Sequence, residues 1–279
     1  MTDLLKENKI TKTELAKKLG ISRASLYYKH KRPAIDEEVR CQIESVLADN
    51  PAYGHKRIAL SLKLNKKRIL RVMKKFGIKP YKRRVKKPRK KDDEGKPMTK
   101  YQNLIKDIKS IKKGEVWVSD FTYLRFKEKF IYLATIMDLY TREVVGFNIS
   151  RFHNSELVLG ALEDVTRKNK PPKYLHSDQG SEYDSQKYTS LAESLGIKIS
   201  MSAKSSPWEN AYQESFYSQF KVDLGKTDRF EELGELVEAI SQAILYYNTK
   251  RIHTALKMPP EEFKRRSQMK DKMPSKLGT

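Results

Sequence analysis

Cysteine and histidine are scarce in this 279-residue sequence, and their scarcity excludes several kinds of site. The single cysteine, Cys41, excludes an intramolecular disulfide and a cysteine-rich zinc site, so a reducing compartment is expected. Five scattered histidines argue against a metal site built from imidazoles. No run approaches the roughly 18 apolar residues of a membrane span, and the N-terminus lacks a signal-peptide core, so no membrane partner is expected.

Acidic residues are missing from one long stretch. Residues 50–91 contain 18 Lys and Arg and no Asp or Glu. The formal net charge is +23, and residues 1–113, with 34 basic and 12 acidic residues, carry +22 of it. A solvated helix normally mixes charges of both signs, so this surface predicts a polyanion partner. The other 166 residues are almost neutral, which indicates a basic arm joined to a globular domain with a different task.

Residues 11–29 have the pattern of a helix-turn-helix, and a first module is assigned to residues 1–32. Thr13 is expected to cap the first helix, Gly20 to end it, Ile21 to be a buried pivot and Ser22 to cap the second helix. The second helix would lie in a major groove of DNA. The residues expected to face the DNA are Arg23, Ser25, Tyr28 and Lys29. An ordinary pair of antiparallel helices uses the same caps and remains an alternative.

A second helical module is assigned to residues 33–79. One helix is expected to stop before Asn50, a second to open at residues 53–55, and a third to run from its cap Asn65 to Gly77. The third helix is basic on its outer face. The predicted DNA contacts of this module are His55, Lys56, Arg57, Lys66, Lys67, Arg68, Arg71 and Lys74.

Residues 80–110 have no periodicity and are interpreted as a basic linker that orders along phosphate backbones. Its predicted DNA contacts are Arg83, Arg84, Lys86, Lys87 and Arg89. The composition also allows a nuclear-localisation signal. Because phosphate contacts position a protein without reading sequence, specificity is expected from the two helical modules.

From residue 111 the pattern changes to that of an α/β domain, assigned to residues 111–268, with a tail at 269–279. Strands are expected over residues 115–126, 130–138, 142–150, 173–176 and 197–201. Helices are expected after Asn154, over 185–195, around Glu214, and from Asp228 to Asn248. The last of these would cover the sheet or form a subunit interface. The order β-β-β-α-β-α-β-α predicts a mixed sheet with helices on both faces, which is the order of the ribonuclease H-like fold.

Three acidic residues are candidates for a metal centre. Asp120 lies within the first strand, where an uncompensated charge is costly, Asp178 follows the fourth strand, and 35 residues separate Asp178 from Glu214. Parallel first and fourth strands would bring the aspartates to one sheet edge. On the helix, Asn210, Glu214 and Tyr217 would share one face. Carboxylates suit two Mg²⁺ ions (Mn²⁺ can substitute) that stabilise the attacking and leaving oxygens of a phosphodiester.

Five segments together resemble the OrfB-type insertion-sequence transposases (the IS-three family), which are relatives of retroviral integrases. They are residues 53–58 (YGHKRI), 117–124 (WVSDFTYL), 176–183 (HSDQGSEY), 210–216 (NAYQESF), and 246–256 (YYNTKRIHTAL) followed by PPEEF at 259–263. The resemblance implies Mg²⁺-dependent cleavage at element ends and transfer of the freed 3′-hydroxyls, with Asp120, Asp178 and Glu214 as catalytic metal ligands. It also implies double-stranded DNA as partner, a circular-DNA intermediate, a multimer of at least two copies, and a bacterial cytoplasmic, nucleoid-associated location.

The sequence departs from the family pattern at Gln179, where Arg is frequent, and at Glu209, where Asp is frequent. These departures concern local DNA contacts more than metal binding. His176 could brace the Asp178 turn or touch DNA. Trp208 could stack on a base or anchor its loop, and Asn210 is a candidate DNA contact.

Two other functions fit parts of the sequence. A non-catalytic DNA-binding regulator derived from a transposase would bind ends without nicking them, but the intact acidic trio argues against it. A ribonuclease H-type nuclease would share the fold, but it leaves the two helical modules unexplained.

Overall fold

A mixed five-stranded sheet lies at the centre of the larger part of the protein in the computed structural model, which describes residues 11–27, 32–81, 101–106, 108–202 and 210–272. The strands are β1 (Val116–Phe126), β2 (Lys129–Asp138), β3 (Val144–Ser150), β4 (Tyr174–Ser177) and β5 (Lys198–Met201). Their order is β3-β2-β1-β4-β5, antiparallel from β3 to β1 and parallel from β1 to β5. This is the predicted ribonuclease H-like arrangement.

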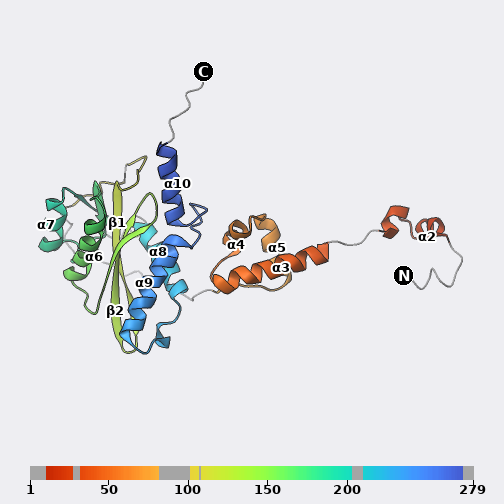
Figure 1. Ribbon diagram of the computed structural model, residues 1–279, viewed down its shortest axis with the longest axis horizontal. Helices are drawn as coiled ribbons and strands as arrows, with labels where there is room; N and C mark the ends of the chain where they lie inside the picture. Colours follow the sequence, from red (N-terminus) through yellow and green to blue (C-terminus); the bar gives the residue numbers. More distant parts are fainter. Residues whose placement is uncertain (1–10, 28–31, 82–100, 107, 203–209, 273–279) are drawn as a thin grey trace, which may run out of the picture.

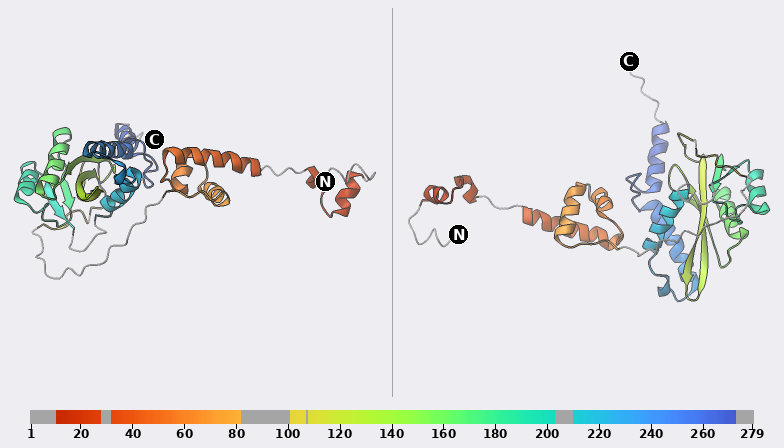
Figure 2. Two further views of the ribbon diagram at one scale, coloured as in Figure 1. Left: turned by 90° about the horizontal axis from the view of Figure 1, so that it is seen from below. Right: turned by 180° about the vertical axis from the view of Figure 1, so that it is seen from behind.

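Helices cover both faces of the sheet, as predicted (Figure 1). On one face, α6 (Ser155–Lys168) and α7 (Gln186–Ser194) enclose a core with the buried side chains of β4 and β5. On the other face, α8 (Ala211–Leu224) and α9 (Leu233–Thr249) pack on β1 and β2. The views of Figure 2 show the same layers. Because β1 is central and covered on both faces, its side chains are buried at Val116, Trp117, Val118 and Ser119.

Two helix boundaries differ from the prediction. The helix expected from Asp228 begins instead at Leu233, because Glu232 and Glu235 form a capping box there and residues 227–229 form the separate 3₁₀ turn η3 (Thr227–Arg229). The helix α10 (Pro260–Lys272) continues past residue 268, where the tail was expected to begin.

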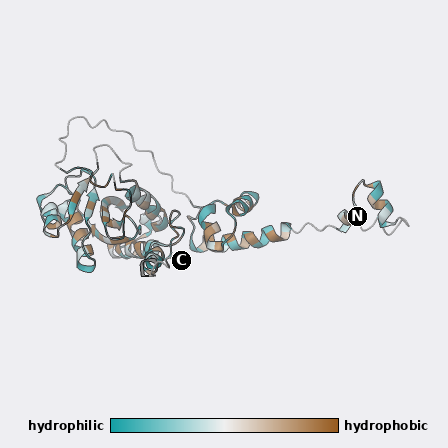
Figure 3. Ribbon diagram, turned by 90° about the horizontal axis from the view of Figure 1, so that it is seen from above, coloured by the Kyte–Doolittle hydropathy of each residue, from teal (hydrophilic) through white to brown (hydrophobic). Residues whose placement is uncertain are grey.

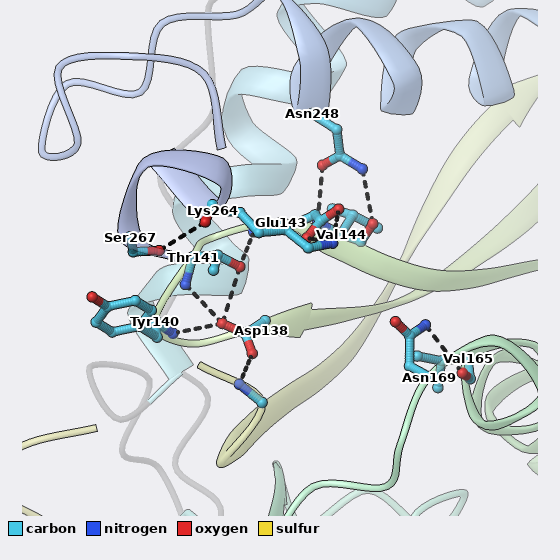
Figure 4. Close-up of polar contacts among 11 residues, drawn as sticks. Asp138, Tyr140, Thr141, Glu143, Val144, Val165, Asn169, Asn248, Lys264 and Ser267 are labelled. Atoms are coloured by element: carbon cyan, nitrogen blue, oxygen red, sulfur yellow. Dashed lines mark hydrogen bonds and ion pairs between the residues drawn. The ribbon is translucent and has the colours of Figure 1, made fainter. Parts of the chain in front are cut away.

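Hydrogen bonds and an ion pair join the C-terminal helices α9 and α10 to the turn between β2 and β3 (Figure 4). The side chain of Asn248, on α9, accepts a hydrogen bond from the Val144 N–H at 3.0 Å and donates one to the Val144 carbonyl at 2.9 Å. On α10, Lys264 pairs with Glu143 at 2.8 Å. Within the turn, buried Asp138 accepts hydrogen bonds from the Tyr140 and Thr141 N–H groups. The helices α9 and α10 therefore belong to the same domain as the sheet.

The second helical module contains α3 (Arg32–Asp49), α4 (His55–Leu62) and α5 (Lys66–Lys75), around a core of its own. Asn65 caps α5 by accepting the Lys67 N–H at 2.8 Å, and Gly77 follows it with φ +66°, as predicted. Colouring by hydropathy shows hydrophobic residues alternating with hydrophilic ones along these helices (Figure 3). Among the described residues no helix is long and apolar enough to cross a membrane.

The first module differs from the prediction in three respects. The cap of α2 (Lys12–Lys18) is Thr11, in a capping box with Glu14, and not Thr13. The second helix is only the five-residue 3₁₀ turn η1 (Arg23–Tyr27), although Ser22 caps it as expected. Ile21 is 41% exposed and not a buried pivot. Two such short elements are too small to enclose a residue between them.

Candidate active site and nucleic-acid interface

The strand register places Asp120 and Asp178 beside each other. The strands β1 and β4 are parallel, with Val118 paired to His176. Asp120 lies two residues beyond this pair within β1, and Asp178 lies two residues beyond it, directly after β4; neighbouring strands run about 4.8 Å apart. The site is therefore at the carboxyl end of β4, where open sheets usually bind ligands.

Hydrogen bonds hold the loop after β4 in place. Asp178 accepts the Gly180 N–H at 3.1 Å, and the Gln179 amide donates to the Ser202 carbonyl at 2.9 Å. Gln179, which departs from the family pattern, therefore ties the loop to the end of β5. Tyr183 is fully buried and accepts a hydrogen bond from Ser119 of β1 at 3.3 Å. These contacts fix the position of Asp178 relative to β1.

The helix α8 is attached to the same part of the sheet. The Gln213 amide donates to the Val118 carbonyl at 2.7 Å, and the Tyr217 hydroxyl donates to the Asp120 carbonyl at 2.6 Å. Glu214 lies between these two anchors and is exposed, whereas Tyr217 is buried. Asn210 and Tyr217 are buried and Glu214 is exposed, so the three residues expected on one helix face differ in burial.

The three acidic groups influence one another electrostatically. Burial, followed by the negative charges of Asp178 and Glu214, raises the pKa of Asp120 to about 8, against the Phe121 N–H that stabilises the carboxylate. Burial also raises the pKa of Asp178, with a smaller contribution from Glu182. A bound cation would relieve both the burial of charge and the repulsion.

The residues of this site fit a hard divalent cation. Their side chains offer only carboxylate oxygens, which Mg²⁺ prefers, and Mg²⁺ commonly binds through one or two carboxylates with water and substrate oxygens completing its shell. Within the part of the chain that the structure describes, no group of three or more His, Cys, Asp or Glu side chains is arranged so that it could hold a metal ion. The aspartate pair is thus the core of the candidate metal site, and Glu214 lies at its rim.

A contact that the sequence did not predict borders the site. The His153 Nε2 atom lies 2.9 Å from the buried carboxylate of Glu182, and the His153 ring packs on Phe121 at a centroid distance of 4.8 Å. His153 thereby connects the loop that carries Asp178 with the residue after Asp120. Nothing in the sequence pattern marked His153, since it lies in a loop between a strand and a helix.

Two further residues predicted for the site, His176 and Asn210, are buried. His176 is 0% exposed and shares a 2.9 Å hydrogen bond with Ser200 of β5, so the structure gives it a bracing role and not a DNA contact. Asn210, expected to contact DNA, is 6% exposed. Its Oδ1 atom has no hydrogen-bond partner among the residues that the structure describes.

The second helical module carries several of the predicted DNA contacts on its surface. Lys56, Lys66 and Lys67 are exposed and line a groove of about 390 Å³ together with Thr254 and Lys257 of the C-terminal segment. Lys74 is also exposed, and His55 and Arg68 are half-buried. The groove extends the basic surface from this module onto the larger domain.

Two of the predicted contacts of this module make contacts within the protein. Arg71 pairs with Asp36 in a bidentate contact, in which Lys75 takes part at 2.9 Å. Arg57 is turned inward and bonds Gln219 and the Ile252 carbonyl, contrary to the expected DNA contact. A basic residue can be placed at an intramolecular contact only when its partners, far away in the sequence, are known.

In the first module, Arg23 and Ser25 are exposed. The remaining predicted contacts lie outside the described residues. They are Tyr28, Lys29, Arg83, Arg84, Lys86, Lys87, Arg89 and Trp208.

The integrase core domain is the family whose models match this chain, one over residues 111–207 and another over residues 195–260. The chain is 30% identical over 269 residues to InsK of Escherichia coli K12, named as a transposase of the insertion sequence element IS150; the match covers 92% of this chain and 94% of InsK. It is 38% identical over 168 residues to the transposase of IS904 from Lactococcus lactis, covering 58% of this chain and 66% of that protein.

Solved structures of retroviral integrases are also similar. The catalytic core domain of HTLV-2 integrase in complex with magnesium aligns with a TM-score of 0.45 and 17% identity, over 54% of this chain and 95% of that chain. The catalytic core domain of BIV integrase aligns with a TM-score of 0.44 and 18% identity, over 57% and 99%.

The sheet order and the core-domain match define a protein with a ribonuclease H-like integrase core. Because the similarity to InsK extends over almost the whole length, the chain belongs to the family of insertion-sequence transposases.

Proposed function

We propose that the protein is a DNA transposase that binds the terminal repeats of an insertion sequence and catalyses Mg²⁺-dependent cleavage and 3′-hydroxyl strand transfer. Asp120, Asp178 and Glu214 are its catalytic and metal-binding residues. The observation that carries the proposal is the pairing of β1 with β4, which sets Asp120 and Asp178 side by side. The electrostatic effect of Glu214 on Asp120 adds the third carboxylate.

The chemistry follows from these positions. Bound Mg²⁺ would supply charge stabilisation for the attacking and the leaving oxygen of the phosphodiester. Asp120 and Asp178 would hold the metal beside the carboxyl end of β4, and Glu214 would approach it from α8. The hydrogen bonds of Gln213 and Tyr217 to β1 keep α8 in place during the reaction. No histidine is needed as a general base.

The DNA is held outside the catalytic centre. The exposed lysines of the second module bind the phosphate backbone, and the first module adds contacts through Arg23 and Ser25. Pairing of two element ends requires at least two copies of the chain. Mn²⁺ can substitute for Mg²⁺ because it accepts the same oxygen ligands.

Strand transfer tests the proposal directly. The full chain is incubated with an element-end duplex, target DNA and Mg²⁺, and joined product is measured on a denaturing gel. Joined product is expected, and Asp120→Asn, Asp178→Asn and Glu214→Gln should abolish it without loss of end binding. The matched control Glu238→Gln, on the exposed surface of α9, should retain activity.

Two results would contradict the proposal. Undiminished strand transfer by Asp178→Asn would refute the metal assignment. Tight end binding without nicking in either Mg²⁺ or Mn²⁺ would show a non-catalytic DNA-binding protein instead.

A further inference from the structure

The helix that carries Glu214 is also held at a second place, in its second half. Gln219 and Asp223 lie in the second half of α8, about 7.5 and 13.5 Å along the helix axis from Glu214. Arg251 is only 1% exposed and forms an ion pair with Asp223. It also donates a hydrogen bond to Gln219 Oε1 at 2.7 Å. This buried arginine ties α8 to the segment that follows α9.

The second helical module also contacts Gln219 and the segment that follows α9. Arg57, on α4, donates to the same Gln219 Oε1 atom at 3.2 Å and to the Ile252 carbonyl at 2.9 Å. The Tyr53 hydroxyl accepts the Ile252 N–H at 2.8 Å, and the Ile252 side chain packs against the hydrophobic core of the module. One helix of the proposed DNA-binding module is therefore bonded directly to the helix of Glu214.

The polar groups of this contact make it sensitive to the relative position of α4 and α8. Two guanidinium groups, from Arg57 and Arg251, meet the amide of Gln219 and the carboxylate of Asp223. A half-buried guanidinium that loses its acceptors leaves polar groups unsatisfied, so the contact is sensitive to geometry. The two acceptors of Arg57 come from different elements, and only a forked donor can reach both.

The geometry points to Arg57 as a positioning residue that fixes α8 relative to the second helical module. We infer that, when Lys56, Lys66 and Lys67 hold the DNA, this contact sets Glu214 at the strand to be cut. Arg57 therefore acts on the rate of strand transfer through α8 and not by binding phosphate. The inference rests on the proposed function for its catalytic consequence, whereas the contact itself does not.

A phosphate-binding role for Arg57 predicts different behaviour. Loss of a phosphate contact weakens DNA binding and lowers the salt dependence of the affinity by about one unit. Loss of a positioning contact leaves affinity almost intact and lowers the rate with DNA at saturation. The neighbouring Lys56, exposed on the same helix, is the matched comparison for the first behaviour.

The test uses the full chain and the variants Arg57→Ala, Arg57→Lys, Gln219→Ala, their Ala double variant and Lys56→Ala. Three quantities are measured: affinity for end DNA as a function of salt, single-turnover strand transfer at saturating DNA, and hydrogen exchange of residues 211–224. For Arg57→Ala we expect at least a tenfold slower reaction, an affinity within about threefold, and faster exchange in α8. Arg57→Lys should restore part of the rate, and the double variant should be slowed by less than the product of the two single effects. Lys56→Ala should lose affinity and show a salt dependence of the affinity that is lower by about one unit.

Several outcomes would overturn the inference. They are an unchanged saturated rate with lost affinity in Arg57→Ala, unchanged exchange in α8, and strictly multiplicative effects in the double variant. If Arg57→Ala fails to fold, as judged by thermal unfolding, Gln219→Ala and Arg57→Lys decide the question in the same assays. Absence of strand transfer by the unsubstituted chain would refute the proposed function, and the exchange and affinity measurements would still decide whether Arg57 fixes α8.

Discussion

At the scale of single residues, burial and charge change what a side chain does. Asp120 lies among buried strand residues and near two other carboxylates, and its pKa is raised accordingly. Asp36 shows the opposite case: it is 2% exposed, and Arg71 and then Lys75 hold the pKa of its carboxyl well below the usual range. Asp120 is thus a candidate ligand for a cation, whereas Asp36 is already paired with basic side chains.

His253 provides a test at this scale. Burial, followed by the charges of Arg142, Arg57 and Arg251, lowers the pKa of His253 to about 4, from about 6.5 in an unfolded chain. The unfolded state therefore binds more protons than the folded state between these values, so the free energy of unfolding should fall as the pH falls from about 6.5 to about 4. Chemical denaturation across this range measures it.

The matched variant isolates the histidine from other titrating groups. His253→Gln should show a smaller loss of unfolding free energy between pH 6.5 and 4 than the unsubstituted chain. Parallel curves for the two proteins over this interval would contradict the assignment.

At the scale of elements, close packing of helix on strand determines how the sheet is covered. A Cβ atom at Gly146 of β3 would lie 2.6 Å from the Val165 Cβ of α6 and 3.0 Å from the Ala161 carbonyl oxygen. The contact between β3 and α6 therefore depends on the absence of a side chain. Gly234, in the first turn of α9, has no atom within 4 Å of the same position.

The two glycines should respond oppositely to the same substitution. Gly146→Ala should destabilise the protein by about 1–3 kcal/mol, because backbone on both sides must move. Gly234→Ala should stabilise it by about 0.5–1 kcal/mol, because alanine favours the helix. Urea unfolding monitored by circular dichroism measures both, and a stabilised Gly146→Ala variant would contradict the packing described here.

At the scale of the whole molecule, the charge is unevenly divided. Residues 1–113 carry a net charge of +22, and the rest carries +1. The three candidate acids thus belong to a near-neutral domain, while the helical modules carry the positive charge proposed to attract DNA. Arg57 and Ile252 connect the two parts, so the proposed DNA-binding module and the domain of the proposed catalytic site are in direct contact.

Salt dependence tests this division. The affinity for end DNA should fall steeply with salt, and Lys66→Ala with Lys67→Ala should reduce the slope of log affinity against log salt by about two. Lys168→Ala is the control, because Lys168 is already paired with Asp164 on the far side of the sheet. An unchanged slope in the double variant would remove this surface from the DNA interface.

The sequence by itself determined the elements and the charges. The strand pattern and the caps at Asn154 and Asn65 could be predicted from local periodicity and helix-capping rules, and the candidate acids Asp120, Asp178 and Glu214 were marked by short sequence motifs. These features depend on neighbours within a few residues, which is why they were predictable. The first module was the exception, because its helices are too short for periodicity to define.

Only the tertiary structure decided which residues meet. The pairing of Val118 with His176, the anchoring of α8 by Gln213 and Tyr217, and the inward turn of Arg57 join residues separated by 58 to 195 positions in the chain. A periodic pattern says which face of an element is buried, but not which distant group lies against it. The partners follow from strand order and helix packing, which exist only once the chain has folded.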